Sequence, residues 1–110
     1  MNYQHKDLAI GRWKRLSFPE QMANIGSEVE RALSWQAKNN TAYSQKAFER
    51  ALELLDLTLD SATDYARLKE VARVREAVAD YFAGLNQFNS TGVSWQKYFM
   101  PFAYLVRSHR

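Results

Sequence analysis

The sequence predicts an all-α fold, specifically an antiparallel up-down four-helix bundle with a short N-terminal lead-in segment. Apolar residues recur at spacings of three and four along most of the chain, which is the periodicity of amphipathic helices. Runs that alternate apolar and polar residues, as strands do, are nearly absent. Only 4 Gly and 2 Pro interrupt 110 residues, so we expect few, long elements in one domain, residues 1–110.

The first long helix is expected from Pro19 to about Lys38. Ser17 can cap it, Pro19 suits its first turn, and Glu20 occupies the capping-box position. Its apolar row consists of Met22, Ile25, Val29, Ala32 and Leu33. Gly26 costs the helix about 1 kcal/mol against alanine. This predicts that another helix approaches closely there, with a bound ligand as the alternative.

Two further helices are expected over residues 42–59 and 62–83. The first has a row of Phe48, Leu52, Leu55 and Leu59, widened by Ala47, Ala51 and Leu54. Such a broad stripe indicates a central helix, or one shared with a second subunit. The second has a capping signal at Ser61 and an inward row of Leu68, Val71, Val74, Val78 and Phe82.

A fourth helix is expected from residue 93 or 94, and we expect Pro101 to kink it. Its segment is dense in large side chains. Because aromatic residues and Met are enriched at protein interfaces, we expect a self-association surface there. The alternative is that these residues only fill the core. The predicted interface residues are Trp95, Tyr98, Phe99, Met100, Phe102 and Tyr104.

Composition excludes several classes of protein. Apolar residues make up 46% of the chain, which argues against disorder. With no cysteine, disulfide frameworks and thiolate metal sites are excluded, and a cytoplasmic location is the simplest expectation. No apolar run is long enough to span a membrane. We expect no cofactor and no metal site, because the 2 His lie near the termini without ligand spacing.

Several polar residues fall beside the apolar rows. Asn24, Glu28, Glu53 and Arg75 are predicted to form a buried polar cluster, in which Arg75 pairs with Glu28 or Glu53. The interpretation we favour is a structural salt bridge that fixes the helix register. The alternative is the active site of a nucleotide- or RNA-directed enzyme.

Both ends of the chain are basic, and the net charge is +3. An up-down bundle of four helices brings both ends to one pole, where a merged patch with Trp13 could contact phosphates. Asp56, Asp60 and Asp64 are expected at the same pole and would partly neutralise it. The predicted nucleic-acid contacts are Lys6, Arg12, Lys14, Arg15, Arg107 and Arg110.

Two stretches, residues 11–29 and residues 47–58, resemble a group of small hypothetical proteins from bacteria and archaea. The resemblance covers most of the chain and implies no activity. The chain is also similar in size, charge and helicity to the four-helix accessory protein of diversity-generating retroelements. HEPN ribonucleases are another helical comparison, but Arg107-Ser108-His109 is too short for their Arg-to-His spacing.

These observations favour a non-enzymatic helical protein that forms homo-oligomers and binds a protein partner. We expect it to be an accessory factor of a nucleic-acid system. The nucleotide- or RNA-directed enzyme and the nucleic-acid-binding protein with a basic pole remain the alternatives.

Overall fold

A computed structural model of the chain describes residues 6–108, with side chains described from residue 9. All secondary structure in this range is helical. The helices are α1 (Lys6–Lys14), α2 (Phe18–Ala37), α3 (Thr41–Ser61), α4 (Tyr65–Ala83) and α5 (Gly92–Ser108). The four long helices lie where the sequence predicts them, and the lead-in segment contains a further helix, α1.

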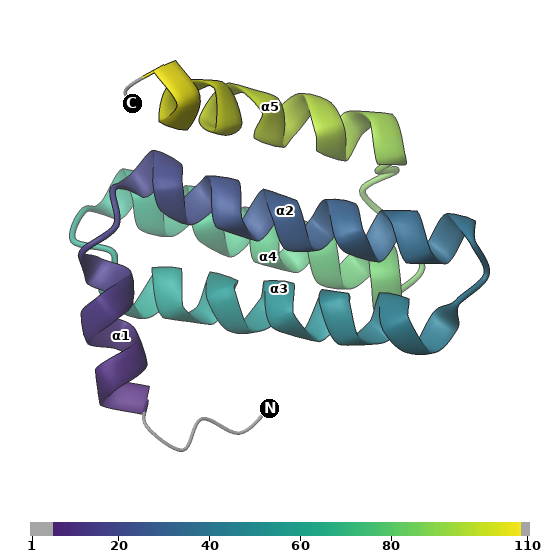
Figure 1. The fold of residues 1–110 in the computed structure, drawn as a ribbon, viewed down its shortest axis with the longest axis horizontal. Helices are drawn as coiled ribbons and strands as arrows, with labels where there is room; N and C mark the ends of the chain where they lie inside the picture. Colours follow the sequence, from purple (N-terminus) through teal and green to yellow (C-terminus); the bar gives the residue numbers. More distant parts are fainter. Residues whose placement is uncertain (1–5, 109–110) are drawn as a thin grey trace.

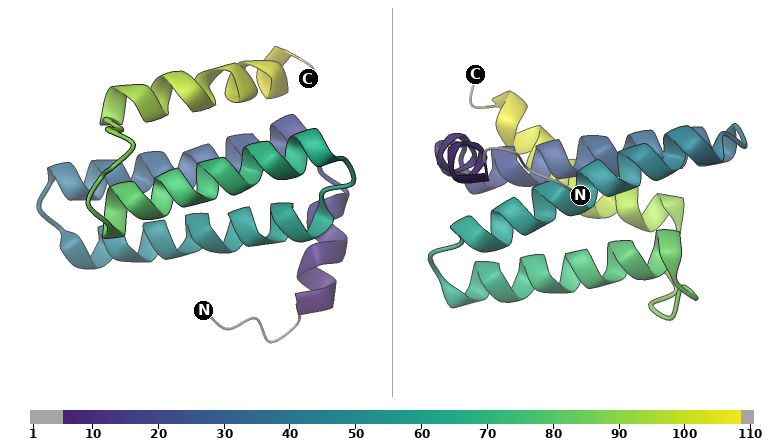
Figure 2. Two further views of the ribbon diagram at one scale, coloured as in Figure 1. Left: turned by 180° about the vertical axis from the view of Figure 1, so that it is seen from behind. Right: turned by 90° about the horizontal axis from the view of Figure 1, so that it is seen from below.

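Figure 1 shows α2 to α5 extending along the longest dimension, each running opposite to the one before it, while α1 crosses one end steeply. Close backbone approach joins α2 to both α3 and α5, and joins α3 to both α4 and α1. The views in Figure 2 show that α5 lies obliquely across α2. The pair formed by α2 and α3 is therefore the centre of the molecule.

The helix ends follow from local hydrogen bonding. Ser17 caps α2 with the predicted capping box, in which Glu20 accepts a 2.9 Å hydrogen bond from the Ser17 backbone N–H. This bond lowers the pKa of the Glu20 carboxyl. The N-cap of α4 is Asp64, three residues after the predicted Ser61, because α3 continues through Ser61. α5 runs through Pro101 to Ser108.

The turn between α2 and α3 is closed by side chains from both helices. Asn39 takes the left-handed conformation, with φ of 60°, just after the end of α2. Trp35 packs edge-on against Tyr43 with ring centroids 4.8 Å apart, and the Lys38 ammonium lies 5.0 Å from the Trp35 ring. These contacts fix α2 and α3 as an antiparallel pair.

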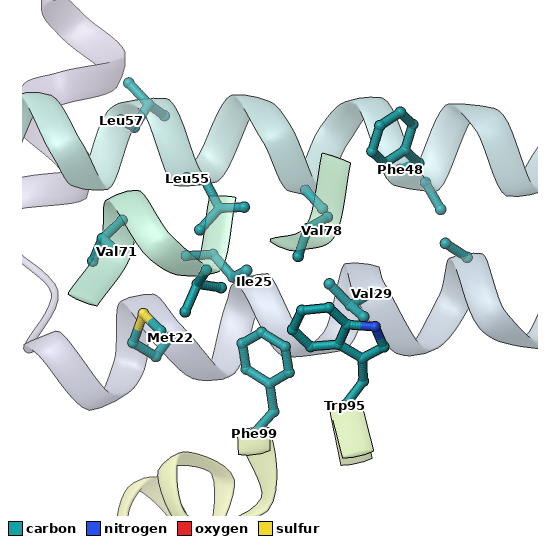
Figure 3. Close-up of a cluster of buried hydrophobic side chains, with 14 of the residues drawn as sticks. Met22, Ile25, Val29, Phe48, Leu55, Leu57, Val71, Val78, Trp95 and Phe99 are labelled. Atoms are coloured by element: carbon teal, nitrogen blue, oxygen red, sulfur yellow. The ribbon is translucent and has the colours of Figure 1, made fainter. Parts of the chain in front are cut away.

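The core contains side chains from all five helices (Figure 3). The predicted close approach at Gly26 is confirmed. A Cβ built on this residue would lie 2.8 Å from Cβ and Cγ of Phe99, so α5 rests directly on the α2 backbone. The buried apolar residues are Trp13, Met22, Ile25, Val29, Ala32, Ala47, Phe48, Ala51, Leu55, Leu57, Val71, Val74, Val78, Trp95 and Phe99.

The broad stripe of α3 has a cause within this chain. Besides the predicted row, α3 buries Leu57 and Thr58 on its α1-facing side. Trp13 of α1 donates a 2.8 Å hydrogen bond from its Nε1 to Oγ1 of Thr58, and Gln21 Nε2 donates to the Trp13 carbonyl at 2.9 Å. The predicted central position of α3 is therefore observed, since it contacts α1, α2 and α4.

The first turns of α4 are more exposed to solvent than predicted. Val71, Val74 and Val78 are buried as expected, but Leu68 is 41% exposed. The prediction for Leu68 was wrong because it extended the apolar row beyond the part of α4 that packs on the core.

Candidate functional site: the α4–α5 groove and the α5 face

The six residues of the predicted interface divide between the interior and the surface. Trp95 and Phe99 are 6% and 7% exposed and point from α5 into the core (Figure 3). Tyr98 and Phe102 are half-buried. Met100 and Tyr104 are 58% and 63% exposed. Core packing accounts for the first two, whereas Met100 and Tyr104 present most of their side-chain surface to solvent.

Exposed apolar side chains gather on α5 and on the loop that precedes it. Of nine large hydrophobic residues exposed in the described part of the chain, six lie between residues 85 and 105. Isolated exposed apolar residues are ordinary, whereas contiguous patches of them are typical of binding surfaces. We call this surface the α5 face; its exposed residues are Leu85, Phe88, Val93, Met100, Tyr104 and Leu105.

A groove of about 620 Å³ lies between α4 and α5. Figure 2 shows these two helices from behind, with α5 lying across the fold beside α4. Phe88 stands at one end of the groove and is 57% exposed. We call this feature the α4–α5 groove; its lining residues are Ala66, Lys69, Glu70, Arg73, Val74, Glu76, Ala77, Phe88, Trp95 and Tyr98.

The loop from α4 to α5 is held by Asp80, near the end of α4. Its carboxylate accepts hydrogen bonds from the backbone N–H groups of Gln87 and Phe88, at 2.8 and 3.0 Å. Its backbone carbonyl accepts from the N–H groups of Gly84 and Asn86. Hydrogen bonds to a charged acceptor are stronger than neutral ones. Phe88 is therefore exposed on a fixed loop.

The second half of the same loop is also held by local hydrogen bonds. The Asn86 amide exchanges two hydrogen bonds with the backbone of Ser90, and Thr91 and Ser94 cap the start of α5 reciprocally. Asn86 and Asn89 both have φ of 54°, a conformation that Asn adopts more readily than most residues. This local hydrogen bonding sets the point at which α5 begins.

A tyrosine–glutamate contact ties α5 to α4 within the groove. The Tyr98 hydroxyl donates a 2.6 Å hydrogen bond to Oε2 of Glu70. Burial, together with this bond and the nearby carboxylate charge, raises the pKa of Tyr98 well above its ordinary value. Tyr98 therefore stays protonated and continues to donate at any ordinary pH.

The indole of Trp95 forms part of the same wall. Its Nε1 is buried and has no hydrogen-bond partner among the described residues. An unsatisfied buried donor costs about 1–3 kcal/mol. Trp95 therefore contributes packing to the wall without the hydrogen bond that Trp13 makes.

The predicted buried polar cluster is not formed. Arg75 pairs with Asp56 of α3 at 2.6 Å, whereas Glu28 pairs with Arg31 and with Arg50 of α3. Both predicted partners of Arg75 were therefore wrong, because Glu28 and Arg75 bind different residues of α3.

The two remaining members of that cluster do not create a site either. Asn24 is exposed and donates a 2.8 Å hydrogen bond to the Glu20 carbonyl of its own helix. Glu53 is half-buried and has no ion pair with the described residues. The geometry that the predicted enzyme site required is therefore absent from residues 9–108.

The basic residues of the two chain ends lie toward one end of the fold, where α1 and the end of α5 are found (Figure 1). The side chain of Lys6 and all of Arg110 lie outside the described residues. Arg12, Lys14, Arg15 and Arg107 are exposed. Two of the expected neutralising acids are instead engaged by α4, since Asp56 pairs with Arg75 and Asp64 with Arg67.

Within the described residues no group of three or more His, Cys, Asp or Glu side chains could hold a metal ion. None of the helices in residues 6–108 is both long and apolar enough to traverse a lipid bilayer.

No family model, curated protein or solved structure matches this chain. The resemblance to small hypothetical bacterial and archaeal proteins therefore stays a prediction.

Proposed function

We propose that this chain is a small non-enzymatic helical protein that acts by association, with copies of itself and with a protein partner. The observation that carries the proposal is the concentration of exposed apolar side chains on α5 and on the loop that precedes it. The loop that presents Phe88 is fixed by Asp80, so the surface exists before a partner arrives. A preformed surface lowers the entropic cost of association.

We regard α2 to α5 as an antiparallel up-down four-helix bundle, to which α1 is added at one end. The bundle is open where α4 and α5 diverge, and this opening is the groove. A cytoplasmic accessory factor of a nucleic-acid system is the biological setting that we propose.

A matched pair of tyrosine variants tests the association. Tyr104→Ser removes an apolar side chain from the α5 face, and Tyr65→Ser removes one from α4 outside it. The two residues are 63% and 77% exposed, so neither change should alter stability by more than about 0.5 kcal/mol. Sedimentation velocity from about 10 µM to about 1 mM covers weak association. Wild type and Tyr65→Ser should self-associate, and Tyr104→Ser should do so less.

The partner is tested with a photo-crosslinking amino acid at residue 104 or at residue 65, in cells that make the protein. Residue 104 should crosslink to other chains more than residue 65. Strictly monomeric wild-type protein, combined with equal crosslinking at the two positions, would refute association through the α5 face.

Nucleic-acid binding is a second candidate, favoured by the exposed cations at the end of α1 and just after it. Arg12, Lys14 and Arg15 form no ion pair with the residues described here, although two nearby acids are paired with α4. Titration of single-stranded RNA at two salt concentrations tests this candidate. Replacing Lys14 by Gln should reduce the slope of log affinity against log salt by about one if the side chain contacts a phosphate.

A further inference from the structure

A second groove, of about 350 Å³, lies between α2 and α5. It shares only Trp95 with the α4–α5 groove, so the two grooves lie on different flanks of α5. The contact between Gly26 and Phe99 joins its two walls. We call this feature the α2–α5 groove; its lining residues are Ala23, Gly26, Ser27, Val29, Glu30, Leu33, Trp95, Gln96, Phe99, Met100, Ala103 and Arg107.

The outer edge of the α5 wall is a single row of side chains. Gln96, Met100, Ala103 and Arg107 follow one another at spacings of four, three and four, which places them on one side of the helix. The row has the same pattern from either end, with a long polar residue outside and an apolar residue inside. A second α5 that runs antiparallel to the first therefore brings Met100 opposite Ala103 of the second copy. A large side chain then faces a small one at both central positions, as in well-packed helix pairs.

The α2–α5 groove contains one carboxylate and one cation, at opposite ends. Glu30 and Arg107 are both exposed, and neither forms an ion pair with the described residues. α2 and α5 run antiparallel (Figure 1), and Gly26 packs on Phe99. Glu30 is one turn from this contact in one direction and Arg107 two turns in the other, so about 18 Å of helix separates them. The two charges cannot pair within one chain.

A two-fold axis brings these charges together between two chains. When the α5 helices of two copies are antiparallel, Arg107 of the second copy lies level with Gln96, at the end of the groove where Glu30 is found. The same pair forms at the other end, so the surface is complementary to itself, as a closed dimer requires. A parallel pair would instead place Arg107 against its own copy, and like charges disfavour such a contact. Lys97, the other charged residue of α5, lines neither groove.

We infer that the α2–α5 groove is the docking site of a second copy of this chain. The α5 helices of the two copies pack antiparallel, and Glu30 of each copy pairs with Arg107 of the other. This inference rests on the proposed function and identifies the geometry of its self-association. Met100 belongs both to this groove and to the α5 face, and Tyr104 follows it by one turn on the same helix.

Reversing one charge at a time should weaken the dimer. Glu30→Arg brings two positive charges together at both ends of the interface, and Arg107→Glu brings two negative charges together. Both side chains are exposed, so both variants should fold, which circular dichroism checks. Sedimentation velocity should show at least about fivefold weaker self-association for each variant than for wild type. Added salt should reduce this difference.

An equal mixture of the two variants separates contacts between chains from effects within one chain. One chain is then positive at residues 30 and 107 and the other is negative at both, so both contacts between the chains become attractive. With one variant fluorescently labelled, the mixture should form heterodimers at least about fivefold more tightly than either variant forms homodimers. An effect within one chain cannot produce this rescue, because each variant carries like charges at the two positions.

Glu76→Arg provides the matched control. It makes the same change in net charge as Glu30→Arg, at an exposed residue of α4 outside the α2–α5 groove. A mixture of Glu76→Arg with Arg107→Glu has the same net charges as the test mixture. One of its two contacts stays repulsive, so it should recover less association than the test mixture.

Three results would overturn the inference: a test mixture that associates no more tightly than its separate variants, a control mixture that recovers as much, or wild-type protein that stays monomeric at about 1 mM. If wild type self-associates and Tyr104→Ser weakens it while the charge variants show no rescue, the proposed function stands and this docking geometry fails. Failure of the proposed function requires monomeric wild type together with equal crosslinking at residues 104 and 65. The two failures are therefore distinguishable.

Discussion

The contact between Gly26 and Phe99 can be tested by adding a single methyl group. In Gly26→Ala the new Cβ would lie 2.8 Å from both Cβ and Cγ of Phe99 and 2.9 Å from Cδ1. One of these atoms is the Phe99 Cβ, which is fixed to the α5 backbone. A rotation of the ring therefore cannot relieve the clash, and α5 itself has to move away from α2.

Two opposing effects determine how much Gly26→Ala changes the free energy of unfolding. Alanine is better than glycine inside a helix by about 1 kcal/mol. Overpacking a close contact costs about 1–3 kcal/mol. The net change in the free energy of unfolding should therefore lie between about zero and a loss of 2 kcal/mol. In a double-mutant cycle, the penalty of Gly26→Ala should be smaller but not absent in a Phe99→Ala background, since Phe99→Ala removes the ring and keeps the Cβ.

Gly11 provides the matched control. It also lies inside a helix, α1, but a Cβ there meets no atom within 4 Å. Gly11→Ala should therefore show only the gain in helix propensity, about 0.5–1 kcal/mol. Urea unfolding followed by circular dichroism gives both free energies, and their difference isolates the clash. If Gly26→Ala stabilises the protein as much as Gly11→Ala does, α5 does not pack closely on α2 at Gly26 and the reasoning is refuted.

Three further predictions test hydrogen bonds described above. Trp13→Phe should reduce the free energy of unfolding by about 1 kcal/mol more than Trp95→Phe, because only the first loses an indole hydrogen bond; chemical denaturation compares them. Asp80→Ala should cost about 1.5–3 kcal/mol and increase amide hydrogen exchange at the two loop residues that it binds, and unchanged exchange would contradict the loop geometry. Above about pH 10 an unfolded tyrosine loses its proton while Tyr98 retains its own, so stability should fall as the pH rises there. Tyr98→Phe should flatten this fall, and an unaltered pH profile would count against the buried bond.

Helix positions were predictable from the sequence because each depends on residues close together in the chain. The capping box at Ser17 and the apolar row of α2 are local patterns, and both are confirmed. Gly26 was also informative, since a glycine inside a helix has a cost that tertiary packing must offset. The lead-in helix α1 lacks such a pattern, and its docking through Trp13 depends on a residue 45 positions away.

The candidate site was less predictable because it depends on how helices rotate and cross. Successive residues of a helix point about 100° apart, so a small error in rotation changes the partner of a charged side chain. Arg75 binds Asp56 for this reason, in place of the predicted Glu28 or Glu53. The α4–α5 groove arises from the oblique path of α5, which no spacing of apolar residues specifies. The excess of large residues on α5 was the available indication, and it did not separate the buried members from the exposed ones.

The three tryptophans of this chain stand at three different junctions of the fold. Trp13 lies between α1 and α3, Trp35 at the turn of α2 and α3, and Trp95 between α5 and the core. Variants that retain one indole each would therefore give a separate fluorescence signal for each junction. Coincident transitions in denaturant would mean that the helices separate together. An earlier transition at Trp95 would show that α5 detaches as a unit while the pair formed by α2 and α3 stays folded.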